Sequence, residues 1–156
     1  MKLEVDGSYR QEEGVIWGGG LLRDHTCKWI TDFMFQEKGG SSFCVEAKAL
    51  RDGLRLAWDR GFRRLICASD NQELVRILSA PGNIQDQVHD GVVREIHEVL
   101  NGDWQVDLSW CRREGIAAAD WLARNGSMLP VPEFRIVKFL PPELEVLLLR
   151  DSLWIR

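Results

Sequence analysis

The chain has 156 residues, the usual size of one domain, and with 45% hydrophobic and 28% charged residues its composition is that of an ordinary globular protein. No apolar run approaches the roughly 20 residues that a membrane-spanning helix needs, so the sequence excludes an integral membrane protein of the helical type. The net charge of −4 at pH 7 argues against binding of nucleic acid through a broad, positively charged surface. Any nucleic-acid site must therefore be confined to a small part of the surface.

The first part of the chain predicts strands that are followed by a long helix. Alternating apolar and polar residues begin at Leu3, and the polar turn at Asp24 suits an antiparallel hairpin between two further strands. A serine provides the N-cap of the helix, and Gly61 stops it. The predicted elements are a strand from Leu3 to about Asp6, strands over residues 15–23 and 27–36, and a helix from Ser41 or Ser42 to Arg60.

The second part of the chain alternates strands and helices. Residues 65–68 form a short apolar run that is typical of a buried strand, and residues 103–111 alternate cleanly as a further strand. Helices are predicted over residues 73–79, 88–100 and 117–124. This order predicts an α/β fold with a five-stranded mixed sheet, in which parallel strands follow an antiparallel meander, and with helices on both faces.

The last part of the chain changes character, and we expect two units. Residues 1–128 would form the folded domain, and residues 129–156 a proline-containing C-terminal tail with a short helix over residues 143–151. The apolar residues of this tail need cover, which the flank of the domain or a second copy in a homodimer would supply.

The cysteines indicate the redox state of the compartment in which the protein is found. Cys27, Cys44, Cys67 and Cys111 are scattered, with no paired spacing and no histidine placed to complete a zinc site. We therefore expect reduced, buried thiols in an intracellular protein, nuclear or cytoplasmic.

Four acidic residues are candidates for chemistry, although each also has an ordinary explanation. Glu46 lies at the margin of the apolar stripe of its helix, but an acidic residue in a first turn also favours the helix dipole. Asp70 follows a buried strand, where open α/β sheets bind ligands, yet it could equally cap the next helix. Asp6 could be a turn residue at a strand end, and Asp120 a surface residue on an alanine-rich helix.

Several short segments, each weak alone, form a specific pattern through their order and spacing. They are Val5-Asp6-Gly7-Ser8, residues 18–24, Glu46-Ala47-Lys48-Ala49-Leu50, Ser69-Asp70, Arg113-Glu114, Ala119-Asp120-Trp121-Leu122-Ala123 and, in the tail, residues 141–142 and 150–152. The pattern resembles the ribonuclease H-like domain of plant-type retroelement proteins, which is associated with reverse transcriptases. The resemblance spans nearly the whole chain and implies a ribonuclease H-like fold.

The resemblance also implies a metal site built from four carboxylates. It assigns two Mg²⁺ ions, with Mn²⁺ as a substitute, to Asp6, Glu46, Asp70 and Asp120. In this family Asp6 would bridge both ions, which lie roughly 3.5–4 Å apart for in-line hydrolysis of a phosphodiester. Asp120 would hold the ion that activates water, and Glu46 and Asp70 the ion at the leaving oxygen. Electrostatics agrees, because carboxylates about 6 Å apart repel by about 3 kcal/mol at an effective dielectric constant of 20 and therefore require a cation or protonation.

The implied substrate is an RNA/DNA hybrid, whose RNA strand would be cleaved and recognised through its 2′-hydroxyl groups. Ser41 and Ser42 match a polar segment that touches the DNA strand in the family, although helix capping explains them equally well. Arg112 and Arg113 follow a strand and lie near Asp120 in the sequence. Arg113 is the candidate phosphate contact, and a purely solvated role for this pair stays open.

The pattern breaks at two positions. Active relatives commonly carry a histidine ten residues before the last aspartate and an asparagine four residues before it, where this chain has Trp110 and Ile116. We interpret Trp110 as a core residue that continues the face of Trp104, Val106 and Leu108. The leading prediction is a metal-dependent endonuclease of low turnover. The alternatives are a catalytically weakened module that binds nucleic acid or protein, and an enzyme for branched or single-stranded DNA.

Overall fold

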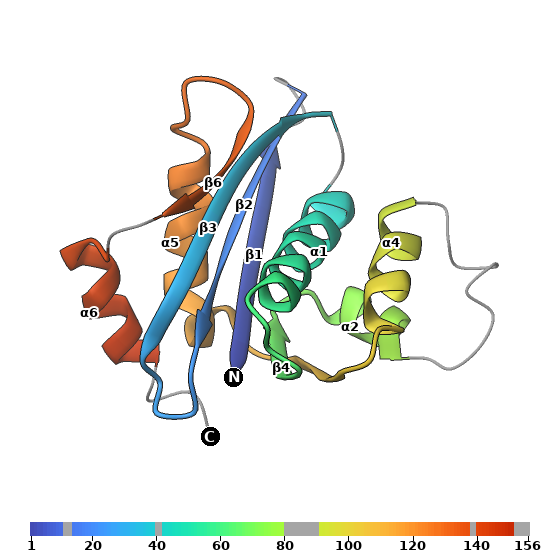
Figure 1. Cartoon of the computed structure of the whole chain (residues 1–156). Helices are drawn as coiled ribbons and strands as arrows, with labels where there is room; N and C mark the ends of the chain where they lie inside the picture. The colour runs from blue at the N-terminus through green and yellow to red at the C-terminus, as the bar shows by residue number, and fades with distance from the viewer. Residues whose placement is uncertain (11–13, 40–41, 80–90, 138–139, 152–156) are drawn as a thin grey trace.

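A computed structural model describes residues 1–10, 14–39, 42–79, 91–137 and 140–151, and in this part of the chain six strands form one mixed sheet (Figure 1). In chain order the elements are β1 (Lys2–Arg10), β2 (Val15–Arg23), β3 (Trp29–Lys38), α1 (Ser42–Asp59), β4 (Arg64–Ser69), α2 (Gln72–Ser79), α4 (Gly91–Leu100), β5 (Gln105–Trp110), the 3₁₀ turn η1 (Arg113–Ile116), α5 (Ala117–Gly126), β6 (Glu133–Val137) and α6 (Pro142–Asp151). None of these described helices is both long and apolar enough to cross a membrane.

The strand order across the sheet is β5-β4-β1-β2-β3-β6. The predicted meander is confirmed, because β2 pairs antiparallel with both β1 and β3. Asp24 shapes the turn between β2 and β3, since its Oδ1 accepts hydrogen bonds from the backbone N–H groups of Thr26 and Lys28 at 2.8 and 3.0 Å. The predicted parallel pairing is present as well, because β4 runs parallel to both β1 and β5. The carboxyl ends of these three strands therefore point to the same end of the sheet.

The prediction of five strands was wrong, because the tail adds a sixth. β6 pairs antiparallel with β3 at the sheet edge, and the Phe134 ring stacks on the Phe33 ring with centroids 5.5 Å apart. The residues of β6 alternate between polar and apolar side chains, but the prolines before and after it gave this segment the character of a loop.

The end of β1 differs from the prediction, and the start of one predicted helix lies outside the described residues. β1 continues past Asp6 to Arg10, so Asp6 lies inside a strand and not in a turn. The helix predicted over residues 88–100 is α4, which is seen from Gly91 onward because residues 80–90 lie outside the described part of the chain.

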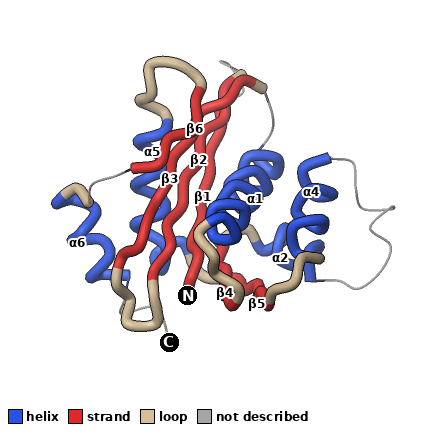
Figure 2. The backbone as a smooth tube through the Cα atoms, viewed as in Figure 1, coloured by secondary structure: helices blue, strands red, loops and turns tan. Residues whose placement is uncertain are grey.

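Helices cover both faces of the sheet, as predicted (Figures 1 and 2). On one face α1 packs on β1 and β2, with α2 and α4 beside it, over a core that includes Leu3, Leu22 and Phe33. On the other face α5 packs on β1, β2 and β3 with α6 next to it, over a second core that includes Leu21 and Met34. Successive strand residues thus supply the two cores alternately.

Gly19 on β2 allows α5 to approach the sheet closely. A Cβ atom at this position would lie 2.9 Å from the backbone carbonyl carbon of Leu122 in α5 and 2.9 Å from the carbonyl oxygen of Phe33. We expect Gly19→Ala to displace α5 and to lower the free energy of unfolding by about 1–3 kcal/mol, as overpacking does. Urea unfolding measures this, with Gly91→Ala as the matched control because its added Cβ would lie within 4 Å of no other described part of the chain apart from its own neighbours. Equal stability of the two variants would contradict the close packing of α5.

The tail packs against the domain of its own chain. Leu144 and Leu148 of α6 are buried beside α5, and the Leu148 carbonyl accepts a hydrogen bond from Arg23 Nη1 at 3.2 Å. Arg23 is fully buried on β2, where its guanidinium also pairs with the buried carboxylate of Glu4. Apolar and charged contacts therefore both hold α6 in place. The described residues give no support to the homodimer predicted through the tail, and the domain boundary predicted at residue 128 stays a prediction.

Candidate metal centre

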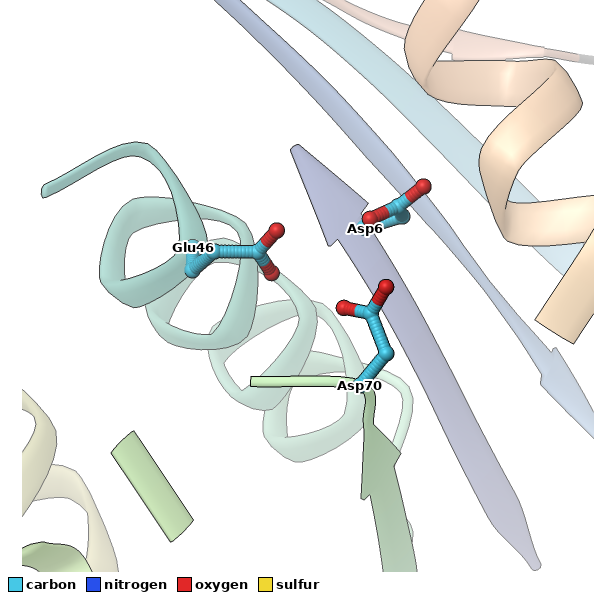
Figure 3. Close-up of side chains that lie close together, drawn as sticks. All are labelled: Asp6, Glu46 and Asp70. Atoms are coloured by element: carbon cyan, nitrogen blue, oxygen red, sulfur yellow. The ribbon is translucent and has the colours of Figure 1, made fainter. Parts of the chain in front are cut away.

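Three carboxylates from three separate elements meet at the carboxyl ends of the parallel strands. Asp6 lies on β1, Glu46 near the start of α1 and Asp70 directly after β4, and each offers an oxygen within 4.8 Å of the others (Figure 3). Asp6 is 2% exposed and Glu46 is 7% exposed, while Asp70 is half-buried. The local sequence does not explain why these carboxylates lie together. Their arrangement results from the tertiary fold.

The parallel pairing of β1 with β4 places Asp6 next to Asp70. Glu4 is the partner of Ala68 in this pairing. Asp6 and Asp70 each lie two residues further along the chain, so they come to the same level in the sheet.

The close contact between α1 and β1 brings Glu46 to the same place. A Cβ atom on Gly7 would lie 2.9 Å from Cγ2 of Val45 and 3.2 Å from its backbone carbonyl carbon. The absence of a side chain at Gly7 thus leaves room for the first part of α1 beside Asp6, and Glu46 follows Val45 directly.

The capping alternative for Asp70 does not hold, because Asn71 caps α2. Asn71 Oδ1 accepts a hydrogen bond from the backbone N–H of Leu74 at 2.9 Å, which is the contact expected between an N-cap and the third residue of a helix. Figure 3 shows the carboxylate of Asp70 directed toward Glu46 and Asp6 instead.

Burial and the neighbouring carboxylates raise the pKa values of Asp6 and Glu46. Burial, followed by the charge of Asp70 and by the nearby carboxyl group of Asp120, raises the pKa of Asp6 to about 7. Burial, followed by the charges of Asp6 and Asp70, raises the pKa of Glu46 to about 9. Among the described residues, Asp6 Oδ1 and Glu46 Oε2 are buried and have no hydrogen-bond partner. Buried carboxylate oxygens without donors fit a divalent cation such as Mg²⁺, which prefers oxygen ligands.

Asp120 lies next to this cluster and not within it. It belongs to the first turn of α5, close enough for its carboxyl group to raise the pKa of Asp6 through a hydrogen bond and through its charge. Its Oδ2 accepts a hydrogen bond from Arg124 Nη2, one turn further along α5, at 2.5 Å. Sequence reasoning missed this arginine, although an acid and a base four residues apart on a helix are the usual signal of such a pair.

The predicted substrate contacts fall outside what the structure describes. Ser41 is not among the described residues. Ser42 begins α1 and Arg113 begins η1, but neither side chain belongs to the described part of the chain. The contacts of these residues with nucleic acid stay predictions.

The interpretation of Trp110 as a core residue was wrong. Trp110 is 47% exposed at the end of β5, and its indole N–H donates a hydrogen bond to the backbone carbonyl of Asp70 at 3.2 Å. Trp104, Val106 and Leu108 do pack against the core. The alternation along β5 cannot show, however, at which residue of this edge strand the helices stop covering it. Ile116 is fully buried beside α5, so an apolar side chain at that position serves packing.

The raised pKa values predict how the stability of the metal-free protein depends on pH. Asp32 on β3 adds a fully buried carboxyl group outside the cluster, and burial raises its pKa to about 7 despite a hydrogen bond from Trp29. A carboxyl group whose pKa is higher in the folded state binds more protons when folded, so stability falls as the pH rises from its unfolded pKa to its folded pKa. In EDTA we expect the free energy of unfolding to fall as the pH rises from 4 to 7, and Glu46 extends the fall toward pH 9.

Urea unfolding at a series of pH values from 4 to 9 measures this dependence. Mg²⁺ should flatten the part of the slope that comes from Asp6 and Glu46, because a bound cation favours their ionised forms. Asp32→Asn should remove the part of the pH dependence that comes from Asp32, which Mg²⁺ leaves unchanged. A stability that rises between pH 4 and 7 in EDTA would show that these groups are not held protonated by the fold.

The chain is similar to known proteins along most of its length. The family model described as "Reverse transcriptase-like" matches residues 4–126. An Arabidopsis thaliana protein named "Putative ribonuclease H protein" is 29% identical over 153 residues, which are 98% of this chain and 24% of that protein. The chain therefore spans about a quarter of the length of this curated relative.

Solved structures share the fold. RNase H1 from the halophilic archaeon Halobacterium salinarum has a TM-score of 0.71 at 21% identity, over 81% of this chain and 96% of that one. The N-terminal RNase H domain of a Mycobacterium tuberculosis protein has a TM-score of 0.69 at 17% identity, over 80% and 92% of the two chains. LC11-RNase H1, solved in complex with an RNA/DNA hybrid, has a TM-score of 0.67 at 15% identity, over 80% and 94%. At these identities the likeness shows a ribonuclease H-like fold.

Proposed function

The chain belongs to the reverse transcriptase-like family, as a ribonuclease H-like domain of the plant retroelement type, and on this premise we propose that it is a metal-dependent endonuclease that hydrolyses the RNA strand of RNA/DNA hybrids. The observation that carries the proposal is the group of Asp6, Glu46 and Asp70, whose oxygens lie within 4.8 Å of one another. Hydrolysis of phosphodiesters with divalent metal uses such groups of carboxylates. A relative named as a ribonuclease H and a structural neighbour bound to a hybrid support the same reaction.

The metal ligands that we propose are Asp6, Glu46, Asp70 and Asp120. When bound there, a pair of Mg²⁺ ions, or Mn²⁺ in their place, would activate the attacking water and neutralise the charge on the leaving oxygen. Asp6 interacts with both Asp70 and Asp120, so it could hold a metal ion together with either of them. Arg124 pairs with Oδ2 of Asp120, so a metal ion at that oxygen would compete with this arginine.

The proposed substrate contacts must be few and local. A chain with a net charge of −4 does not hold a hybrid through broad attraction to phosphates. We therefore assign substrate binding to the carboxylate end of the sheet, together with Ser41, Ser42 and Arg113. Selection of RNA over DNA would come from contacts with the 2′-hydroxyl groups across the shallow minor groove.

A catalytically weakened module that binds nucleic acid or protein is the second candidate. Trp110 and Ile116 favour it, because they stand where active relatives commonly carry histidine and asparagine. The pairing of Arg124 with Asp120 favours it too, since it engages one proposed metal ligand. Such a module would bind its partner without measurable turnover.

Cleavage of an end-labelled RNA annealed to DNA tests the proposal. We expect endonucleolytic products with Mg²⁺ or Mn²⁺, none with EDTA, and much slower reaction on branched DNA and single-stranded DNA. Asp70→Asn should lower the rate by about a hundredfold or more, which is the loss typical of removing one group that stabilises charge in the transition state. The matched control Glu73→Gln removes an exposed carboxylate three residues away and should keep the wild-type rate.

Two results would count against the proposal. If the wild-type chain binds the hybrid but yields no product with either metal, the weakened module is the better account. If Asp70→Asn cleaves as fast as the wild type, the carboxylate group is not the active site.

A further inference from the structure

Trp110 is an exposed aromatic side chain at the edge of the carboxylate site. It ends β5 and is aligned in the sheet with Ser69, the residue before Asp70. Its indole N–H donates a hydrogen bond to the Asp70 carbonyl oxygen at 3.2 Å, and the residue is 47% exposed. The ring is therefore fixed to the backbone of a proposed metal ligand and still presents an apolar surface to solvent.

Outside the tail region, the described residues include few large hydrophobic side chains that are exposed. Among the described residues, the other large hydrophobic residues that are exposed are Ile66 within β4 and several between residues 128 and 149, in the tail region. An indole that is already oriented by a hydrogen bond loses little conformational freedom when a ligand packs on it.

Arg112 adds a positive charge to the same segment. It is exposed and lies two residues after Trp110, where the chain leaves β5 in an extended conformation. Proteins that bind nucleic-acid strands commonly combine an aromatic ring, which packs on a nucleotide, with cations that contact the phosphates.

We propose that Trp110 is a substrate-contact residue whose indole ring packs against the sugar and base of one nucleotide beside the phosphate at the carboxylate site. The inference rests on the proposed function, because a nucleic-acid strand must cross this end of the sheet for the ring to meet it. Such a contact tolerates any sequence, since every base offers a flat face. It supplies affinity that the net charge of −4 does not.

Binding of a labelled RNA/DNA hybrid, followed by fluorescence anisotropy in Mg²⁺, tests the contact. All proteins carry Asp120→Asn, which the proposed function makes deficient in cleavage. Trp110→Ala should weaken binding about tenfold, within the range measured for the loss of one stacked base. Trp110→Phe keeps a flat ring without the indole N–H and should stay within about threefold of the parent. Phe134→Ala, which truncates a residue that is also 47% exposed but lies at the opposite edge of the sheet, should bind like the parent.

Two outcomes would overturn the contact. Unchanged affinity in Trp110→Ala would show that the ring meets no nucleotide. Equal weakening in Trp110→Ala and Trp110→Phe would show that the indole acts through its hydrogen bond to Asp70 and not through its surface.

Tryptophan emission gives a second measurement that does not depend on the folding of Trp110→Ala. The hybrid should quench the emission of the parent more than that of Trp110→Phe, and equal quenching would again overturn the contact. The two proposals also fail separately. Absence of cleavage by the unmodified chain, together with weaker binding by Trp110→Ala, removes the endonuclease and leaves the contact. Cleavage with unchanged affinity removes the contact and leaves the endonuclease.

Discussion

Replacing Asp6 by Asn is expected to abolish most of the thermal stabilisation that Mg²⁺ or Mn²⁺ gives to the wild-type protein. A ligand that binds only the folded state adds about 2.7 kcal/mol at a hundredfold excess over Kd, which corresponds to a rise in Tm of about 5–10 °C for a chain of this size. Asp6 is buried between the other carboxylates, so its loss should weaken every ion held there. The metal-free variant should be more stable than the metal-free wild type, because an amide removes one charge from a crowded site.

Thermal unfolding with and without metal measures both effects. Asp107→Asn is the matched control, since it removes the same carboxylate from an exposed position on β5 and should keep the wild-type response. A metal-induced rise in Tm of equal size in Asp6→Asn and in the wild type would show that the ions bind elsewhere.

The second large effect is expected at Arg23, which has no part in the proposed chemistry. Arg23→Ala should lower the free energy of unfolding by about 3–5 kcal/mol, because it leaves the buried carboxylate of Glu4 with only the ammonium group of Lys2, 3.8 Å away. It also removes the donor to the Leu148 carbonyl, so α6 loses a fixed contact with the sheet. Urea unfolding measures the loss.

Two further variants separate the buried pair from general effects of losing an arginine. Arg64→Ala truncates an exposed arginine at the start of β4 and should change stability by less than about 0.5 kcal/mol. Replacing Glu4 and Arg23 together by leucine should recover much of the loss, because apolar residues often substitute for a buried ion pair at little cost. A loss for Arg23→Ala no larger than for Arg64→Ala would contradict this account of how the tail is held.

Much of the fold was predictable because local signals agree with the tertiary structure. The period-two pattern of residues 27–36 and the polar turn at Asp24 predict the β2–β3 hairpin from local sequence alone. β6 escaped prediction because its pairing with β3 depends on contacts across some hundred residues, while the prolines around it suggest a loop. Asp6 was expected at a strand end, but β1 continues because Gly7 and the residues after it pair with β2.

The site was predictable only in part. In the sequence alone, each of these carboxylates has an ordinary structural explanation. Only the resemblance to a known family grouped Asp6, Glu46, Asp70 and Asp120 as one site. The structure places the first three within reach of one cation and Asp120 beside them. Trp110 is exposed because the packing against β5 ends before it, and the period of the sequence pattern does not predict where such packing ends.

Anomalous scattering from crystals soaked in MnCl₂ tests most directly whether the carboxylates form a metal centre. We expect a manganese peak between the carboxylate oxygens of Asp6, Glu46 and Asp70, which lie within 4.8 Å of one another, and no such peak in Asp6→Asn. Manganese bound only at other places on the wild-type protein would contradict this expectation.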